Sequence, residues 1–66
     1  MTIKDNDKKM KIIEILKKEN RWISTNQIRN LIGLHPYKAE ILLNELLSEN
    51  KVEVDKKDNA TYWRLR

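Results

Sequence analysis

The stretch STNQIRNLIGLHPYKAEILLNELLSENKVEV, residues 24–54, decides the fold because it holds two helical patterns separated by a sharp turn. Ser24 followed three residues later by Gln27 is a capping-box pattern, which predicts the start of a helix. Three apolar residues then recur with the spacing of one helix face: Ile28, Leu31 and Ile32. Gly33, the only glycine of the chain, predicts the helix end, because glycine adopts a left-handed conformation easily. We therefore expect a helix over residues 25–32.

The second helical pattern begins at Pro36, since proline is favoured at the first position of a helix. We expect this helix to extend to about Glu49. On a helical wheel, one broad apolar face is predicted to join the core: Ala39, Leu42, Leu43, Leu46 and Leu47. A narrow stripe of different character lies opposite: Tyr37, Ile41, Asn44 and Ser48. Glu40 and Glu45 flank the stripe, and we expect Glu45 and Glu49 to face solvent.

A third helix is predicted before this stretch. Residues 1–7 are polar without an apolar repeat, so we expect a flexible N-terminus. Residues 8–19 follow a helical pattern of apolar and charged residues that ends near Asn20. Four residues form its apolar side: Ile12, Ile13, Ile15 and Leu16. Residues 21–23 are rich in β-forming types and predict one brief strand.

A β-hairpin is predicted after the stretch. Residues 51–55 and 61–66 each alternate apolar and polar side chains, as half-buried strands do. Residues 56–60, Lys-Lys-Asp-Asn-Ala, form a polar connection with turn-favouring residues. Four side chains are expected to face inward: Val52, Val54, Trp63 and Leu65.

This order of helix, short strand, helix, turn, helix, strand and strand resembles the winged helix-turn-helix of small prokaryotic and archaeal transcription regulators. The resemblance extends from about residue 9 to residue 66. Its markers include the capped start, the turn and the exit into the hairpin: Ser24, Gly33, Leu34, Leu46, Asn50, Val52 and Val54. It implies an α+β fold in which a single winged-helix domain, residues 8–66, combines a three-helix core with a small antiparallel β-hairpin wing.

The resemblance also implies a site for double-stranded DNA. The first half of the helix from residue 36 would enter the major groove, the start of the helix over 25–32 would contact phosphate, and the hairpin tip would follow the backbone. The residues concerned are Thr25, Asn26, His35, Tyr37, Lys38, Ile41, Asn44, Lys56, Lys57 and Asn59. The chain departs from the usual pattern in two respects: residues 36–49 contain no arginine, and His35 stands where serine or threonine is more usual.

The exposed stripe can be matched to bases by its chemistry. Asn44 can pair bidentately with adenine, Ile41 can touch a thymine methyl, and the Tyr37 hydroxyl can reach phosphate. Such a stripe suits A·T-rich duplexes. The apolar pair of Tyr37 and Ile41 equally fits a protein or dimer interface.

Other candidate residues also have ordinary structural interpretations. His35 fits a turn residue as well as a phosphate or base contact, and Lys56 and Lys57 fit a solvated loop as well as a phosphate contact. The lysine-rich side of the helix over 8–19 fits a solvated face. Two aromatic residues are expected in the core or at its edge: Trp22 and Trp63.

Composition bounds the function classes. The 66 residues suffice for one domain, and 14 Lys and Arg against 10 Asp and Glu give a formal charge of +4. The charge is +2 over residues 1–20, zero over 21–50 and +2 over 51–66, so attraction to phosphate must come mainly from the two ends. There is no cysteine and no apolar run long enough for a membrane span, and a cytoplasmic domain is expected.

Catalytic and metal chemistry have little support in the sequence. The single histidine has no partner ligands at metal-binding spacing, no nucleophile–base pattern stands out, and one glycine cannot make a phosphate-binding loop. We expect neither an enzyme nor a cofactor. The function expected is a DNA-binding regulator; the alternative is a protein-interaction module of replication or transcription machinery. A monomer is expected, or a weak homodimer through the helix over 8–19, where Met10 borders the apolar face.

Overall fold

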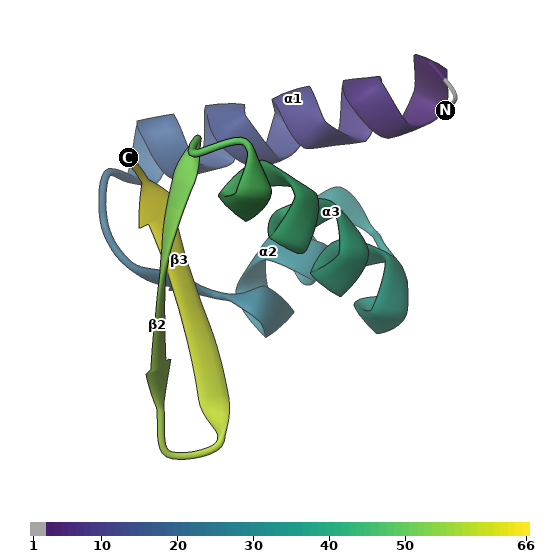
Figure 1. Cartoon of the computed structure of the whole chain (residues 1–66). Coiled ribbons are helices and arrows are strands. Elements are labelled where there is room, and N and C mark those ends of the chain that lie inside the picture. The colour runs from purple at the N-terminus through teal and green to yellow at the C-terminus, as the bar shows by residue number, and fades with distance from the viewer. Residues whose placement is uncertain (1–2) are drawn as a thin grey trace.

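Three helices and one three-stranded antiparallel sheet make up residues 3–66, the part of the chain that this computed structural model describes (Figure 1). The elements in chain order are α1 (Ile3–Glu19), β1 (Ile23–Ser24), α2 (Thr25–Ile32), α3 (Pro36–Ser48), β2 (Val52–Lys57) and β3 (Ala60–Leu65). The predicted α+β class is confirmed, and the arrangement is compatible with a winged helix. Within residues 3–66, no helix has both the length and the apolar character that crossing a membrane requires.

Helix α1 starts earlier than the sequence predicts. Residues 3–7, expected to be a flexible terminus, are helical, while residues 1 and 2 lie outside the described part of the chain. Extending a helix that is anchored further along costs little compared with nucleating one, so polar residues can join it without burying a face. Strand β1 is Ile23–Ser24, which starts two residues later and ends one residue later than the strand predicted over residues 21–23.

The ends of α2 and α3 form as the sequence predicts. Ser24 Oγ accepts a hydrogen bond from the Gln27 N–H at 3.1 Å, and Gly33 has the left-handed φ of 82°. The Gly33 N–H donates to the Arg29 carbonyl at 2.7 Å, which closes α2. Helix α3 begins at Pro36 and ends at Ser48, one residue before the predicted end. These caps fix the angle at which α3 leaves α2.

The sheet joins the hairpin to the helical core. Its strand order is β1-β3-β2, with Val52 opposite Leu65 and Val54 opposite Trp63. A two-residue turn connects β2 and β3, and Asp58 in that turn has a φ of 52°, a conformation that aspartate tolerates. Lys56 and Lys57, predicted to lie in the connection, therefore belong to β2.

One hydrophobic core lies between the helices and the inner face of the sheet. Its buried residues are Ile12, Leu16, Ile23, Ile28, Leu34, Ala39, Leu42, Leu43, Leu46, Val52 and Trp63. Val54 and Leu65 pack against it as predicted, and Trp63 is a core residue. Trp22 is half-buried, with the Arg64 guanidinium 5.2 Å from its ring centroid.

Leu31 does not join this core. The sequence places it on the apolar face of α2, but its side chain is 63% exposed. On a helix of eight residues, Ile28 faces the core directly, and Leu31 is turned about 60° from it toward a hollow lined mainly by polar residues. Leu31 is therefore a surface residue on α2.

A buried lysine ties α1 to α3. Lys9 is only 7% exposed, and its Nζ lies 2.8 Å from Glu45 Oε1 and 2.9 Å from Glu49 Oε2. Both glutamates face solvent as expected, with side chains 47% and 41% exposed, and they also pair with Lys9 because α1 crosses α3 where the lysine can reach both. Hydrogen bonds to Glu45 and Glu49 raise the pKa of Lys9 above its ordinary 10.5. The hydrogen bond from Lys9 lowers the pKa of Glu49 below 4.5.

These shifts predict how stability depends on pH. A lowered carboxylate pKa stabilises the fold above pH 4.5 and is lost as pH falls through the folded-state pKa. A raised lysine pKa stabilises the fold below pH 10.5 and is lost as pH rises through the folded-state pKa. Lys9→Met should therefore lower the thermal midpoint by several degrees near neutral pH and flatten both limbs of its pH profile. Thermal unfolding followed by circular dichroism checks this, and Lys11→Met, at an exposed site on α1, should retain the wild-type profile.

Candidate nucleic-acid interface

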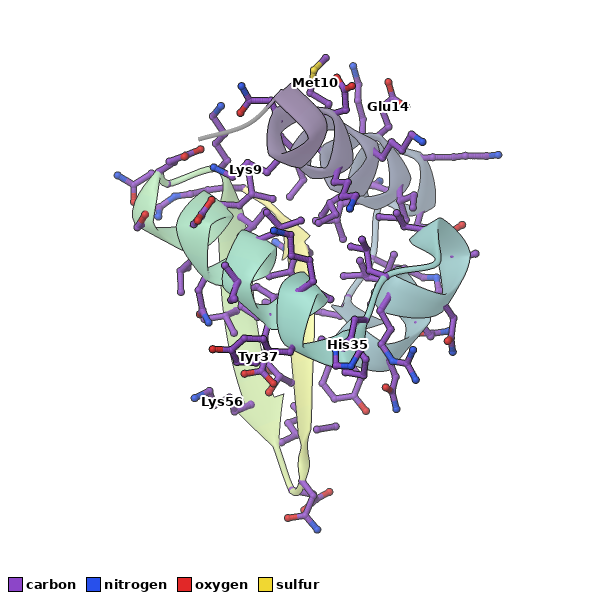
Figure 2. All side chains as sticks on the ribbon, turned by 90° about the vertical axis from the view of Figure 1, so that its right-hand side faces the viewer. Lys9, Met10, Glu14, His35, Tyr37 and Lys56 are labelled. Atoms are coloured by element: carbon purple, nitrogen blue, oxygen red, sulfur yellow. The ribbon has the colours of Figure 1, made fainter. Side chains whose placement is uncertain are left out.

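The outer side of α3 combines aromatic, aliphatic and amide groups. Tyr37 is 72% exposed and Ile41 is 36% exposed, and Asn44 one turn later is exposed as well. The opposite side of the helix is held in the core by Ala39 and its leucine neighbours. Figure 2 shows Tyr37 below α3 on the same side of the molecule as Lys56, with His35 at the start of the helix. The predicted stripe is therefore open to a ligand.

A groove of about 350 Å³ lies between the Glu40 flank of α3, the start of α2 and the hairpin. It is lined by Ser24, Thr25, Asn26, Pro36, Glu40, Asn59, Ala60, Thr61 and Tyr62. Three predicted site residues, from α2 and the hairpin turn, thus meet in one place. The polar groups in the groove are hydroxyls and amides, and Glu40 supplies the one charged side chain among the lining residues.

The two hairpin lysines point to different sides of the sheet. Successive residues of a strand alternate between faces, so Lys56 shares the inner face with Val52 and Val54 and extends it beyond the core. Lys57 takes the outer face, where its Nζ lies 3.9 Å from Asp55 Oδ2. The two lysines therefore do not form one basic patch, and Lys56 is the one on the side of Tyr37 (Figure 2).

Thr25 has a structural task that the sequence did not reveal. Its Oγ1 accepts a hydrogen bond from Trp63 Nε1 at 2.8 Å and donates one to the Thr61 carbonyl at 3.4 Å. Phosphate oxygens only accept hydrogen bonds, so a hydroxyl whose proton is already committed is a poor phosphate ligand. Thr25 thus joins the start of α2 to β3.

Removal of this hydroxyl should destabilise the fold. In Thr25→Val the shape is nearly kept, but the indole N–H of Trp63, a residue 2% exposed, loses its acceptor. A buried donor left unpaired costs about 1–3 kcal/mol, and urea unfolding should show that loss. Thr25→Ser keeps the hydroxyl and should cost about 0.8 kcal/mol or less. Equal losses in the two variants would contradict this role.

Arg29, which was not among the residues predicted from the sequence, stabilises the turn before α3. Its Nη1 donates to the Leu34 carbonyl at 3.4 Å, and its Nε donates to Asn26 Oδ1 at 3.3 Å. Because the Asn26 oxygen is occupied, its amide nitrogen remains as the donor that can meet a phosphate. The three-residue spacing of Asn26 and Arg29 on a helix was the available signal.

His35 caps α3 through its ring. Nδ1 accepts a hydrogen bond from the Tyr37 N–H at 3.2 Å, so the neutral ring carries its proton on Nε2. His35 is exposed, and Nε2–H is therefore a donor at the start of the helix. The structural and ligand-binding interpretations of His35 are compatible, since they use different nitrogens.

Lys38 and Asn59 lie at the margins of the site. Lys38 is half-buried and stands on the flank of α3 opposite Glu40, while Asn59 is exposed in the hairpin turn.

In the described residues, no group of three or more His, Asp or Glu side chains could hold a metal ion. The candidate site is thus an open polar surface on α3, the start of α2 and the inner side of the hairpin.

Comparisons of this chain with protein-family models, with curated proteins and with solved structures gave no match. Function therefore has to be inferred from the residues and their arrangement. The features that bear on it are the exposed Tyr37–Ile41 pair, the groove beside Glu40 and the position of Lys56.

Proposed function

We propose that this chain is a double-stranded DNA-binding winged-helix protein, a small cytoplasmic transcriptional regulator. In this proposal α3 enters the major groove and the β2–β3 hairpin is the wing that lies along the backbone. The order of elements, the capped turn between α2 and α3 and the hairpin that extends beyond the core support it.

The observation that carries the proposal is the exposed stripe on α3. Tyr37 is 72% exposed and lies beside the partly exposed Ile41. Apolar surface in contact with water is unfavourable, so a contiguous exposed pair of this kind is typical of a binding site. Tyr37, Ile41 and Asn44 supply a phosphate donor, an apolar contact for a thymine methyl and a bidentate partner for adenine. A site that contains A·T pairs fits this set.

The electrostatics of α3 are also more favourable than its sequence suggests. Lys9 pairs with both Glu45 and Glu49, two of the three acids in and just after the helix, and its single positive charge offsets one of their two negative charges. Besides the Tyr37 hydroxyl, three further groups would contact phosphates around the stripe: Lys56, the Asn26 amide and the His35 Nε2–H. Because few phosphates are contacted, binding should be modest and its dependence on salt concentration shallow.

A duplex titration at several salt concentrations tests the proposal. Each phosphate contact that is removed should lower the slope of log affinity against log salt by about one unit. Lys56→Ala should therefore weaken binding to all duplexes and lower the slope, while Lys57→Ala should have less effect because Lys57 lies on the outer face beside Asp55. Lys11→Ala on α1 is the matched control. No binding at low salt would sink the proposal.

We also propose that the domain binds as a monomer. On α1, Met10 is 60% exposed and the half-buried Ile13 lies beside it. Charged side chains border this small apolar surface, with Asp7, Glu14, Lys11 and Lys18 on one flank. Pairing two α1 helices through Met10 and Ile13 would therefore bury little apolar surface, which disfavours a stable dimer.

The alternative, a protein-docking module, is supported by the same Tyr37–Ile41 pair. Ile41→Gln separates the two. If the stripe reads bases, this variant should lose about fivefold or more in affinity for a duplex selected from a random pool, with an unchanged salt slope. Leu31→Gln, at an exposed apolar site on α2, should bind as wild type does. Selected-duplex affinity that is identical in wild type and Ile41→Gln would favour protein docking.

A further inference from the structure

Glu40 occupies a position that phosphate binding alone does not explain. It is exposed, and it lies in the groove between α3 and the hairpin, where the sugar-phosphate backbone of one DNA strand would be expected to pass. Over residues 3–66 it forms no ion pair, whereas Glu45 and Glu49 share Lys9. The groove around it offers hydroxyl and amide groups and no cation.

The groove also shows which flank of α3 faces the hairpin. Glu40 and Lys38 stand on opposite flanks of the stripe formed by Tyr37, Ile41 and Asn44. Since Glu40 shares a groove with Asn59 and Thr61 of the hairpin, the acidic flank is the hairpin flank. The recognition surface is therefore asymmetric, and its acid lies next to the stripe.

A carboxylate restricts what can lie against it. It accepts hydrogen bonds and cannot donate, so phosphate oxygens, guanine N7 and O6 and thymine O4 are all excluded as direct partners. In the major groove, only the exocyclic amines of cytosine and adenine donate. Adenine carries the acceptor N7 beside its amine, which repels a carboxylate, whereas cytosine has no acceptor there. Cytosine is thus the favoured partner.

We propose that Glu40 is a specificity-determining residue that accepts a hydrogen bond from the N4 amine of a cytosine next to the base pairs read by Ile41 and Asn44; this inference rests on the proposed DNA binding. It adds a selective contact to a surface otherwise suited to A·T pairs. Glu40 also disfavours phosphate against its own carboxylate, so the phosphates contacted by Lys56 and by the Asn26 amide would lie away from Glu40.

An acid near the start of a helix also stabilises the helix dipole. Glu40 is the fifth residue of α3, beyond the first turn, where that effect has largely decayed. Thermal midpoints of wild type and Glu40→Gln should therefore agree closely, and sequence preference is the property that separates the two roles.

The test compares wild type, Glu40→Gln and Glu14→Gln on duplexes selected from a random pool with the wild-type protein. Glu14 is an exposed acid on α1 at the opposite end of the molecule from Tyr37, so Glu14→Gln makes the same charge change away from the site (Figure 2). Each base pair of the selected duplex is then varied. For wild type and Glu14→Gln, replacing one particular cytosine should lower the affinity for the duplex about 5- to 150-fold, the range of a good base contact. Glu40→Gln should bind unrelated duplexes more tightly and lose most of that preference.

Replacing the selected cytosine by N4-methylcytosine sharpens the test, because the duplex still pairs but the major-groove N–H is gone. The affinity of wild type should fall as it does when the base is changed, while the affinity of Glu40→Gln should be the same for both duplexes. A uniform gain in affinity for Glu40→Gln with an unchanged cytosine preference would overturn the inference and leave the proposed function intact. Absence of any duplex binding by wild type at low salt would overturn both.

Discussion

The structure depends on one buried ammonium group. Lys9 reaches from α1 to two carboxylates on and just after α3, and it is itself almost completely covered. A buried lysine is tolerated only where its charge is paired, and here both partners remain in contact with solvent, which limits their desolvation. The same contact links α1 to the end of α3 and offsets one of the two negative charges there. Packing and electrostatics are thus coupled through a residue remote from the site.

The local elements could be predicted well, because their signals lie within a few residues of one another. Ser24 and Gln27 cap α2, Gly33 ends it, and Pro36 starts α3, as the sequence pattern indicates. The inward side chains of the hairpin also follow directly from alternation. Contacts between distant residues were missed. Lys9 and Glu49 are 40 positions apart, and Thr25 and Trp63 are 38 positions apart. No periodicity encodes such pairs, since they depend on how the elements cross. The burial of Leu31 was predicted wrongly, because a helical wheel shows which face of a helix is apolar but not whether another element covers that face.

The candidate site could also be predicted only in part from the sequence. That Tyr37 and Ile41 are exposed follows from the helical period of α3. Which flank of α3 faces the hairpin does not, because it requires the position of β3, and this placement gives Glu40 its importance. Lys56 and Lys57 are adjacent in sequence yet lie on opposite faces, a distinction that appeared once both were found in a strand and not in a loop. The positive charge of the ends is therefore less concentrated on the site than the sequence totals suggest.

The hydroxyl of Thr25 has a consequence for the thermodynamics of binding. It links the first residue of α2 to the indole N–H of Trp63 and to the carbonyl of Thr61, so β3 is held to the helix by two hydrogen bonds, one at its middle and one near the turn. A hairpin fixed in this way loses little conformational freedom when a ligand arrives. The surface is thus preorganised along β3, with flexibility left to the two-residue turn and the long lysine side chains. An association of this kind should show a small entropic penalty and little change in backbone shape between the free and bound states.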